Sequence, residues 1–226
     1  MLKDIRGAVR TIVVISLSAV TLWGAKADVE RLTAATETLT ELQTKISQGL
    51  ADKAMCAIVV PSMKKAGFIV GAKYGRGYAS CRKADGGWTA PAGMRIEGGS
   101  FGLQIGGADS DVVILVMNKE GMEKLLQSKF TLGGDATAAV GPVGRQGDAQ
   151  TDALMHAQML TWAKSKGVFA GVSLDGSTMR PDDDTNKELY GASATNPEIL
   201  TGKYPVPADA EAFLAALNKF SPHKSS

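Results

Sequence analysis

Few residues in this sequence have a type and spacing that could support catalysis. Gly98, Ser100 and Gly102 match G-x-S-x-G, the nucleophile elbow of serine hydrolases. That chemistry needs a strand before the serine, a helix after it, and an acid and a histidine later in the chain. The segment that follows, LQIGGADSDVVILVM, has the pattern of strand, turn and strand, and His156 is the only histidine downstream that precedes the C-terminal tail. We therefore expect no catalytic residues and no enzymatic activity.

The residues that commonly bind metal ions are few and unsuitably spaced. The chain has two cysteines and two histidines, without the spacing of a zinc site. The run Asp182–Asp184 lacks the alternating oxygen ligands and central glycine of a calcium loop. Consecutive aspartates are instead favourable at the N-terminus of a helix. We expect no metal ion and no cofactor, and a structural role for His156.

The first 27 residues have the pattern of a secretory signal peptide. A basic head is followed by an almost uninterrupted apolar run, and Ala25-Lys26-Ala27 supplies the small-x-small pattern of a cleavage site. The alternative is a retained membrane anchor, but the run from Ile12 to Trp23 has only 12 residues, whereas a spanning helix needs about 20. We predict cleavage after Ala27 and export to the periplasm or cell envelope. Residues 28–220 then form the domain, and residues 221–226 form a flexible tail.

The two cysteines, Cys56 and Cys81, are predicted to form a disulfide. Both lie in the part of the chain expected to be exported, and oxidising compartments favour disulfides. Such a bridge closes a loop of 26 residues, which in the chain-entropy account stabilises a fold by about 3–4 kcal/mol. The alternative is a pair of buried free thiols. Cysteine catalysis is not expected, because neither histidine lies near either cysteine in the sequence.

Removal of residues 1–27 changes the charge balance. The whole chain has 25 lysines and arginines and 23 aspartates and glutamates. The first 27 residues hold four of these bases and one of these acids, so the remainder carries 21 and 22, a net charge near −1. This balance predicts no nucleic-acid partner. An anionic ligand must therefore be bound by a local cluster of cations.

The periodicity of the apolar residues predicts one α+β domain. Residues 28–54 are predicted to form one long amphipathic helix, which either docks on the core or enters a membrane interface. Short strand patterns separated by turns follow, which favours an antiparallel sheet curled into a barrel or sandwich, with a C-terminal helix packed on it. Lys166-Gly167 and Asp175-Gly176 are expected to be hairpin turns. The predicted strands cover residues 56–60, 66–79, 94–96, 100–105, 112–117, 130–132, 138–143, 160–165, 168–174 and 177–180, and further helices cover residues 121–128, 152–159, 182–190 and 208–220.

The segment AGFIVGAKYGRGYASC is unusually rich in glycine. Its glycines are Gly67, Gly71, Gly75 and Gly77, and they match neither nucleotide-binding loop pattern. Their even spacing places all of them on one face of a strand. A strand with a bare face allows another backbone, a bulky ring or an acyl chain to approach closely. We therefore predict that these four are close-approach positions.

Four longer motifs occur in order along the chain: P-x-x-K-x-A-G-F-x-x-G, W-x-x-P-A, G-x-Q-x-G and S-K-G-x-F-x-G. With the intervening sequence they extend over residues 51–217. In these motifs the chain resembles the SYLF-domain family of lipid-binding proteins, in its exported bacterial branch. The resemblance implies binding of membrane lipids, including phosphoinositides in eukaryotic members, where the domain recruits actin and endocytic machinery. It implies no enzymatic activity.

For an exported protein, the implied partner is a phospholipid or another anionic lipid at a membrane surface, and the cytoskeletal role does not transfer. Lys64, Lys65, Lys73 and Arg76 surround the glycine-rich strand. Such residues can attract phosphate headgroups with about 1 kcal/mol each near an anionic surface. We predict that these four bind lipid; the alternative for each is an ordinary solvated charge.

Two further features are weaker candidates. Lys164 and Lys166 form a second cationic cluster, and Trp88 and Trp162 are rings suited to a membrane interface, although burial in the core is the commoner fate of tryptophan. The alternative function is a structural or adaptor protein that binds another envelope protein through the N-terminal helix or a sheet edge.

Overall fold

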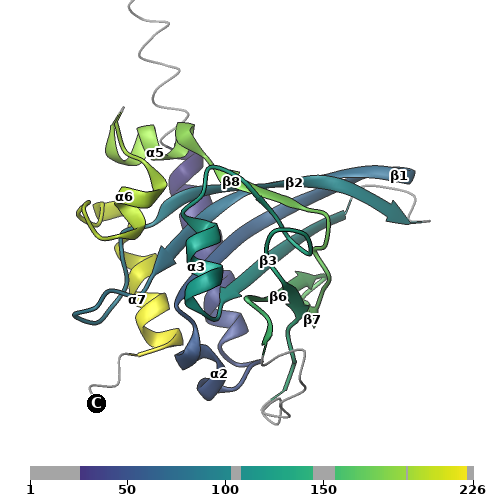
Figure 1. Ribbon diagram of the computed structural model, residues 1–226, viewed down its shortest axis with the longest axis horizontal. Helices are drawn as coiled ribbons and strands as arrows, with labels where there is room; N and C mark the ends of the chain where they lie inside the picture. Colours follow the sequence, from purple (N-terminus) through teal and green to yellow (C-terminus); the bar gives the residue numbers. More distant parts are fainter. Residues whose placement is uncertain (1–25, 103–107, 145–155, 192, 223–226) are drawn as a thin grey trace, which may run out of the picture.

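The computed structural model describes residues 26–102, 108–144, 156–191 and 193–222 (Figure 1). A helix over residues 26–42 precedes α2 (Gln48–Lys53). The strands are β1 (Cys56–Cys81), β2 (Ala92–Gly102), β3 (Ala108–Val116), β4 (Phe130–Thr131), β5 (Ala138–Val140), β6 (Met159–Ser165), β7 (Val168–Gly171) and β8 (Thr178–Pro181). The remaining helices are α3 (Lys119–Leu125), α5 (Asp183–Tyr190), α6 (Asn196–Leu200), the 3-10 turn η1 (Ala208–Ala210) and α7 (Glu211–Phe220).

The strands form one curled sheet in the order β4-β8-β2-β1-β3-β6-β5, with β7 paired to β6. The pairing of β5 with β6 is parallel, and the other pairings between these strands are antiparallel. Helices from the N-terminal and C-terminal parts of the described chain pack together on this sheet. The predicted α+β fold class is therefore confirmed, in the form of a single mixed sheet.

The helix predicted over residues 28–54 is wrong in its extent. The chain is helical over residues 26–42 and again in α2, with a turn between them. Ser47 has an extended backbone, and its side chain accepts a hydrogen bond from the Leu50 N–H at 3.3 Å, so it caps a new helix. Leu42 and Ile46 nevertheless bury their side chains in one cluster. The apolar stripe therefore continues past the end of the helix, which is why periodicity alone did not reveal the break.

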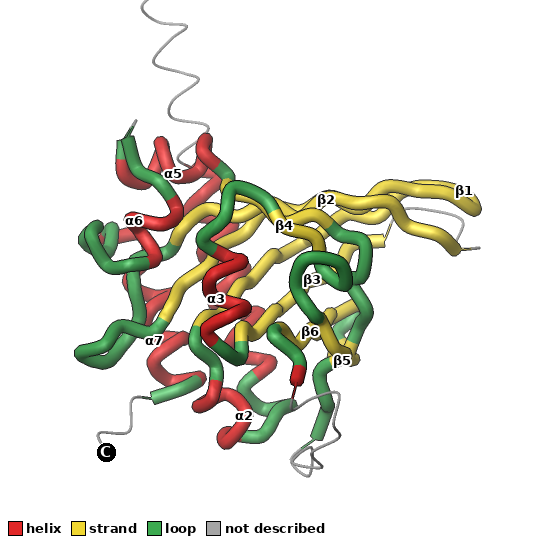
Figure 2. Tube along the Cα trace, viewed as in Figure 1, coloured by secondary structure: helices red, strands yellow, loops and turns green. Residues whose placement is uncertain are grey.

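β1 is one element in which the chain doubles back. Its first part pairs with β3 and its second part with β2. Cys56 and Cys81, at its two ends, have Cα atoms 3.9 Å apart, and the Arg82 N–H donates to the Met55 carbonyl at 2.7 Å. The two ends are therefore neighbours. The bend of β1 and the C-terminal end of β2 project beyond the helices, and we call this projection the arm (Figures 1 and 2).

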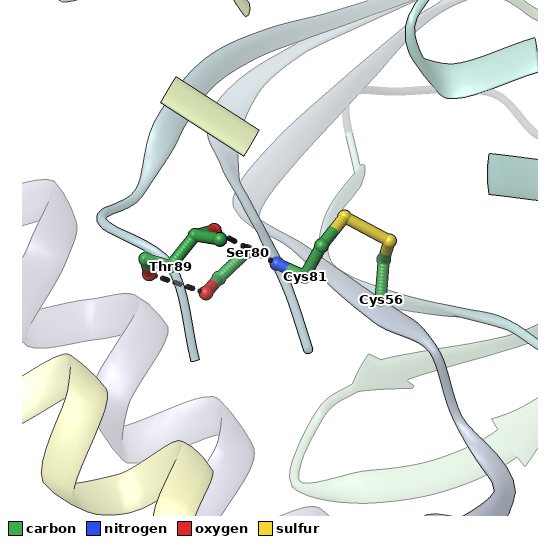
Figure 3. Close-up of a disulfide and its surroundings, with 4 residues drawn as sticks. All are labelled: Cys56, Ser80, Cys81 and Thr89. Carbon is green, nitrogen blue, oxygen red and sulfur yellow. Dashed lines mark hydrogen bonds between the residues drawn. A yellow bond between two sulfur atoms is a disulfide. The ribbon is translucent and has the colours of Figure 1, made fainter. Parts of the chain in front are cut away.

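The predicted disulfide between Cys56 and Cys81 is confirmed. It lies beside Thr89, whose hydroxyl accepts a hydrogen bond from the Cys81 N–H at 3.0 Å and whose carbonyl accepts one from the Ser80 hydroxyl at 2.7 Å (Figure 3). All four residues are buried. The base of β1 is therefore closed by a covalent bond and by hydrogen bonds that are shielded from water.

Both faces of the sheet are covered. The face that carries Val59, Tyr78 and Trp162 packs against helix 26–42 and α7, and we call it the α7 face. The face that carries Ile58 and Met94 packs against α3 and α6, and we call it the α3 face. Side chains alternate between the faces along a strand, so a strand buried on both sides is apolar throughout. This explains the continuous apolar run at the start of β1.

A bulge at Pro61 and Ser62 shifts this alternation by one residue. The register of β1 against β3 changes between Val60 and Met63, and both of these side chains belong to the α3 face. Ser62 has a φ of 50°, and its N–H donates to the Asp111 carboxylate at 2.9 Å. Beyond the bulge, the odd-numbered residues of β1 lie on the α3 face.

The hairpin turns were predicted with mixed success. Lys166-Gly167 joins the paired strands β6 and β7, with φ values of 50° and 79°, as predicted. Asp175-Gly176 also forms a turn, in which the Ser177 N–H donates to the Leu174 carbonyl at 3.0 Å. It does not close a hairpin, because β7 pairs with β6 whereas β8 pairs with β2 and β4.

Two helices differ from their predictions. Of the helix predicted over residues 152–159, residues 152–155 lie outside the described residues, and Met159 already belongs to β6. α6 was not predicted, although Pro197 in its first turn suits a helix start. Within the described ranges, no helix is long and apolar enough to cross a membrane. The apolar run Ile12–Trp23 lies outside these ranges.

Candidate functional site

The four predicted lipid-binding cations lie on two different faces of β1. Lys65 and Lys73 follow the odd-numbered alternation of Met63 and Ala79, so they belong to the α3 face. Arg76 belongs to the α7 face with Tyr78. The structure therefore brings the predicted residues together in pairs and not as one cluster.

Lys73 is nearly buried, with 8% of its surface exposed. It lies directly opposite Gly98 of β2, and a Cβ atom at Gly98 would lie 3.0 Å from the Lys73 Cε atom. Gly98 therefore leaves the space through which the lysine side chain passes. The same position faces the backbone of Gly176 and Ser177. The lysine is thus enclosed by β1, β2 and the turn before β8.

Lys65 and Lys73 form what we call the lysine pair. Burial lowers the pKa of Lys73, the nearby charge of Lys65 lowers it further, and Asp175 opposes both effects. Within the described residues, neither lysine forms an ion pair or a hydrogen bond. An unpaired ammonium group in a partly buried position is unfavourable unless an anion approaches it. This arrangement suits the binding of an anionic group.

On the opposite face, Lys64 and Arg76 line a groove between helix 26–42 and β1. The groove has a volume of about 340 Å³ and is also lined by Arg31 and Tyr74. Lys64 is 72% exposed and lies 3.5 Å from an Asp109 carboxylate oxygen. Tyr74 exposes 43% of its surface. This groove is open and is bordered by cations that already have carboxylate partners.

Arg76 is engaged with α5 and with the residue before it. Its guanidinium donates to the carboxylate of Asp182, which is fully buried, and to the Thr185 hydroxyl at 2.9 Å. Burial alone raises the pKa of Asp182, but the hydrogen bond and charge of Arg76, with the charge of Arg95, outweigh it, so the net pKa is lowered. Asp182 is therefore a carboxylate that holds arginines in place. Arg76 has a structural role at this position.

Three arginines lie directly opposite one another across neighbouring strands. Arg76 of β1 faces Arg95 of β2, and Arg95 faces Arg180 of β8. Arg95 lies 3.5 Å from Asp182, and Arg180 donates to Glu97 at 2.7 Å. We call these three residues the arginine row. It lies on the α7 face, opposite the lysine pair.

Two of the predicted close-approach glycines, Gly75 and Gly77, are packed by the chain itself. A Cβ atom at Gly77 would lie 2.0 Å from the Val59 carbonyl oxygen, and one at Gly75 would lie 2.5 Å from the Val60 side chain. The group that approaches Gly75 and Gly77 closely is therefore the backbone and side chains of β1 itself. Gly71 is half-buried on the same face, and Gly67 lies in the bend of β1.

The second cationic cluster and the two tryptophans have structural roles in the fold. Lys164 pairs with Glu41 at 2.7 Å, and Lys166 forms the exposed β6–β7 turn. Trp88 and Trp162 are buried in the core, and the Arg82 guanidinium stacks 4.4 Å from the Trp88 ring.

The G-x-S-x-G match lies within β2, which is paired with β1 along this stretch, and the strand–turn–helix geometry of a nucleophile elbow is not formed. Among the described residues, no group of histidines, cysteines and carboxylates could hold a metal ion.

Several residues of these sites were not found from the sequence. Arg95 and Arg180 were placed in predicted strands, but only the strand register brings them opposite Arg76. Asp182 was predicted to begin a helix, and this is confirmed, yet its pairing with Arg76 spans 106 positions. Gly98, which is followed directly by Gly99, offered a detectable sign, because glycine in a strand often marks close approach of another group.

The fold and these sites define a class of protein: a single α+β domain whose functional features are charged side chains on a sheet, without a catalytic constellation among the described residues. The chain belongs to the Ysc84 family. The profile described as "Ysc84: Las17-binding protein actin regulator" matches residues 97–220. This confirms the expected SYLF-domain family.

The relatives are longer proteins. The chain is 38% identical over 165 residues to "SH3 domain-containing YSC84-like protein 1" of Homo sapiens, which covers 73% of the chain and 48% of the relative. It is 35% identical over 164 residues to "SH3 domain-containing protein PJ696.02" of Schizosaccharomyces pombe, covering 71% of the chain and 38% of the relative. It is 31% identical over 163 residues to "Protein YSC84" of Saccharomyces cerevisiae, covering 71% and 35%. The chain thus spans about half or less of the length of these relatives.

Proposed function

We propose that this protein is a non-enzymatic lipid-binding domain that acts at the bacterial cell envelope. Its ligands are phospholipids or other anionic lipids at a membrane surface. The family membership supports a binding domain, and no feature of the described residues favours an enzyme. In this proposal residues 1–27 are a signal peptide removed after Ala27, and the buried disulfide suits the oxidising compartment that the protein then enters.

The observation that carries the proposal is the lysine pair. Lys73 is nearly buried and, like Lys65, has no ion pair or hydrogen bond within the described residues. Both lie near the arm, whose bend contains the apolar sequence Phe68-Ile69-Val70. Cations without ion pairs beside a projecting pair of strands match a bilayer surface, because the cations favour the phosphate groups.

Liposome co-sedimentation of residues 28–226 tests the proposal. Vesicles of phosphatidylglycerol and phosphatidylcholine are compared with vesicles of phosphatidylcholine alone. We expect binding to the anionic vesicles that weakens at least tenfold in the double variant Lys65→Gln/Lys73→Gln. Lys64→Gln is the control for loss of one cation, because it removes one positive charge from the opposite face at an exposed position. Equal, negligible binding to both vesicles would count against lipid binding.

An adaptor function is a second candidate, favoured by the relatives' names. The family description refers to binding of Las17, and several relatives are called SH3 domain-containing. In this second proposal the domain binds another envelope protein through helix 26–42 or a sheet edge. Cross-linking in an envelope extract distinguishes the two. Capture of one protein that is unchanged by Lys65→Gln/Lys73→Gln, without vesicle binding, supports the adaptor.

A further inference from the structure

The arginine row is an unusual arrangement for a sheet. Like charges directly opposite each other on neighbouring strands destabilise the pairing. Here the opposition occurs twice in succession, from Arg76 to Arg95 and from Arg95 to Arg180. A fold keeps such a row only where anions compensate the repulsion. The carboxylates around the row must therefore be counted against its three positive charges.

The described carboxylates in contact with the row compensate it only in part. Asp182 serves both Arg76 and Arg95, and Glu97 serves Arg180. The Nε atoms of Arg95 and Arg180 are buried, and no acceptor among the described residues lies within hydrogen-bonding distance of either atom. A buried donor without an acceptor is costly, more so when it is charged. The Nε atoms of both guanidinium groups thus lack a hydrogen-bond acceptor among the described residues.

Arg95 and Arg180 line the same cavity, which has a volume of about 460 Å³. A water molecule occupies about 30 Å³ of liquid, so the cavity has room for a much larger group. Ser128 and Gln127 add side chains that can donate hydrogen bonds, whereas the Thr195 hydroxyl donates to Glu198 at 2.8 Å. Asp183 is the carboxylate among its lining residues, and it is exposed at the start of α5.

The cavity is reachable because the edge of β8 is open there. β4 pairs only with Met179 and Thr178 of β8, so Arg180 and Pro181 lie beyond the end of that pairing. The Arg180 side chain is 43% exposed and that of Arg95 is 22% exposed. A ligand can therefore approach both guanidinium groups from the side of the sheet.

We infer that Arg95 and Arg180 form a binding site for a phosphate group in this cavity. Planar guanidinium groups donate paired N–H bonds that fit phosphate oxygens, and two of them side by side can share one tetrahedral anion. The bound anion accepts hydrogen bonds from the outer N–H groups of the two partly exposed guanidiniums and reduces the repulsion within the row. The cavity lies beside β8, between the end of α3 and α6, and neither member of the lysine pair lines it. The phosphate belongs either to a lipid headgroup or to a free phosphate ion.

Isothermal titration calorimetry of residues 28–226 with sodium phosphate, at low and constant ionic strength, tests the site. We expect saturable binding that is at least tenfold weaker in Arg180→Gln. Arg180→Lys keeps the charge but loses the paired donors, so it should also weaken binding, by a smaller factor. Lys64→Gln is the control for loss of one exposed cation and should leave the affinity unchanged. Absence of saturable binding, or equal affinity in wild type and Arg180→Gln, overturns the inference.

Two further comparisons make the result specific. If Arg180→Gln fails to fold, the comparison of Arg180→Lys with wild type decides, because the charge balance with Glu97 is retained. Phosphate binding should persist in Lys65→Gln/Lys73→Gln, which separates this site from the proposed lipid-binding lysine pair. Vesicles of phosphatidylglycerol then identify the source of the phosphate: a parallel loss of vesicle binding in Arg180→Gln assigns it to a lipid headgroup. Loss of phosphate binding alone assigns it to a free ion.

Discussion

The two ends of the second part of β1 differ in whether their charged or tightly packed residues have partners within the fold. Towards Cys81, each such residue has a partner. Cys81 forms a disulfide with Cys56, the backbone of Val59 packs against Gly77, and Arg76 donates to the Asp182 carboxylate. Towards the arm, Lys73 is enclosed without an ion pair or a hydrogen bond among the described residues. Positions that cost stability and are not compensated within the fold are expected where a protein binds something else. The base of β1 maintains the fold, whereas the proposed lipid-binding lysines lie near the arm.

The largest loss of stability is expected from Asp182→Asn at the base. This change removes a fully buried carboxylate that contacts Arg76 and Arg95 and leaves their charges uncompensated. Breaking a buried ion pair from one side costs about 3–5 kcal/mol. Denaturant unfolding measures the loss, and Asp183→Asn, which alters an exposed carboxylate one residue later, should change stability by less than about 0.5 kcal/mol. Equal effects of the two variants would contradict the structural role of Asp182.

Loss of the disulfide should have the next largest effect. The variant Cys56→Ala/Cys81→Ala opens a bridge between residues 25 positions apart, which we expect to lower the free energy of unfolding by about 3–4 kcal/mol. The measurement is denaturant unfolding without reductant. Addition of reductant should then destabilise the wild type and leave the double variant unchanged. A wild type that is insensitive to reductant under unfolding conditions would contradict this prediction.

A smaller loss is expected from Gly77→Ala. The new Cβ atom would lie 2.0 Å from the Val59 carbonyl oxygen, so the backbone of one part of β1 must move. Overpacking of this kind costs about 1–3 kcal/mol. Gly99→Ala in β2 is the matched control, because nothing lies within 4 Å of its added Cβ. Thermal unfolding of the two variants compares them directly, and a similar melting temperature for both would show that the base of β1 is not tightly packed.

The smallest effect, opposite in sign, is expected at the arm. Lys73→Met removes an ammonium group whose charged form is disfavoured by burial and should stabilise the fold by about 0.5–1 kcal/mol at neutral pH. The pKa of Lys73 is lowered below 10.5 in the folded state. At a pH between this folded-state pKa and 10.5, the unfolded chain therefore binds more protons than the folded protein. Wild-type stability should therefore gain from this group as the pH rises through that window.

The Lys73→Met variant should lack this rise, and vesicle binding should weaken with it. Melting temperatures measured from neutral to alkaline pH in both proteins provide the comparison. A variant that is less stable than the wild type at neutral pH would show that Lys73 contributes to the fold, and the contrast between the arm and the base would then fail.

Much of the fold follows from local patterns. The β6–β7 hairpin was predicted because Lys166-Gly167 suits a tight turn, and α5 because its aspartates suit a helix start. The disulfide followed from the presence of only two cysteines. The break after residue 42 escaped prediction because the apolar stripe continues beyond it through Ile46.

The site was less accessible to prediction. The sequence placed four cations near one strand, but their distribution over two faces depends on the bulge at Pro61 and Ser62 and on the bend of β1. The arginine row depends on the register of three strands, and the partner Asp182 is distant in sequence from Arg76. Such long-range pairings are decided by packing of the whole domain and leave no local trace in a single sequence.

The contacts between α7 and the segment after helix 26–42 affect how the chain folds during synthesis. Gln43 donates to the Lys219 carbonyl at 2.8 Å, and Gln48 donates to the Phe220 carbonyl at 3.0 Å. During synthesis on the ribosome, the early segment is complete long before these acceptors exist. Its buried leucines, such as Leu39, then lack part of their cover, since α7 belongs to the same cluster. The nascent chain therefore exposes the apolar residues of helix 26–42 and of the segment after it until α7 has been synthesised. We expect chaperones to bind this part of the chain.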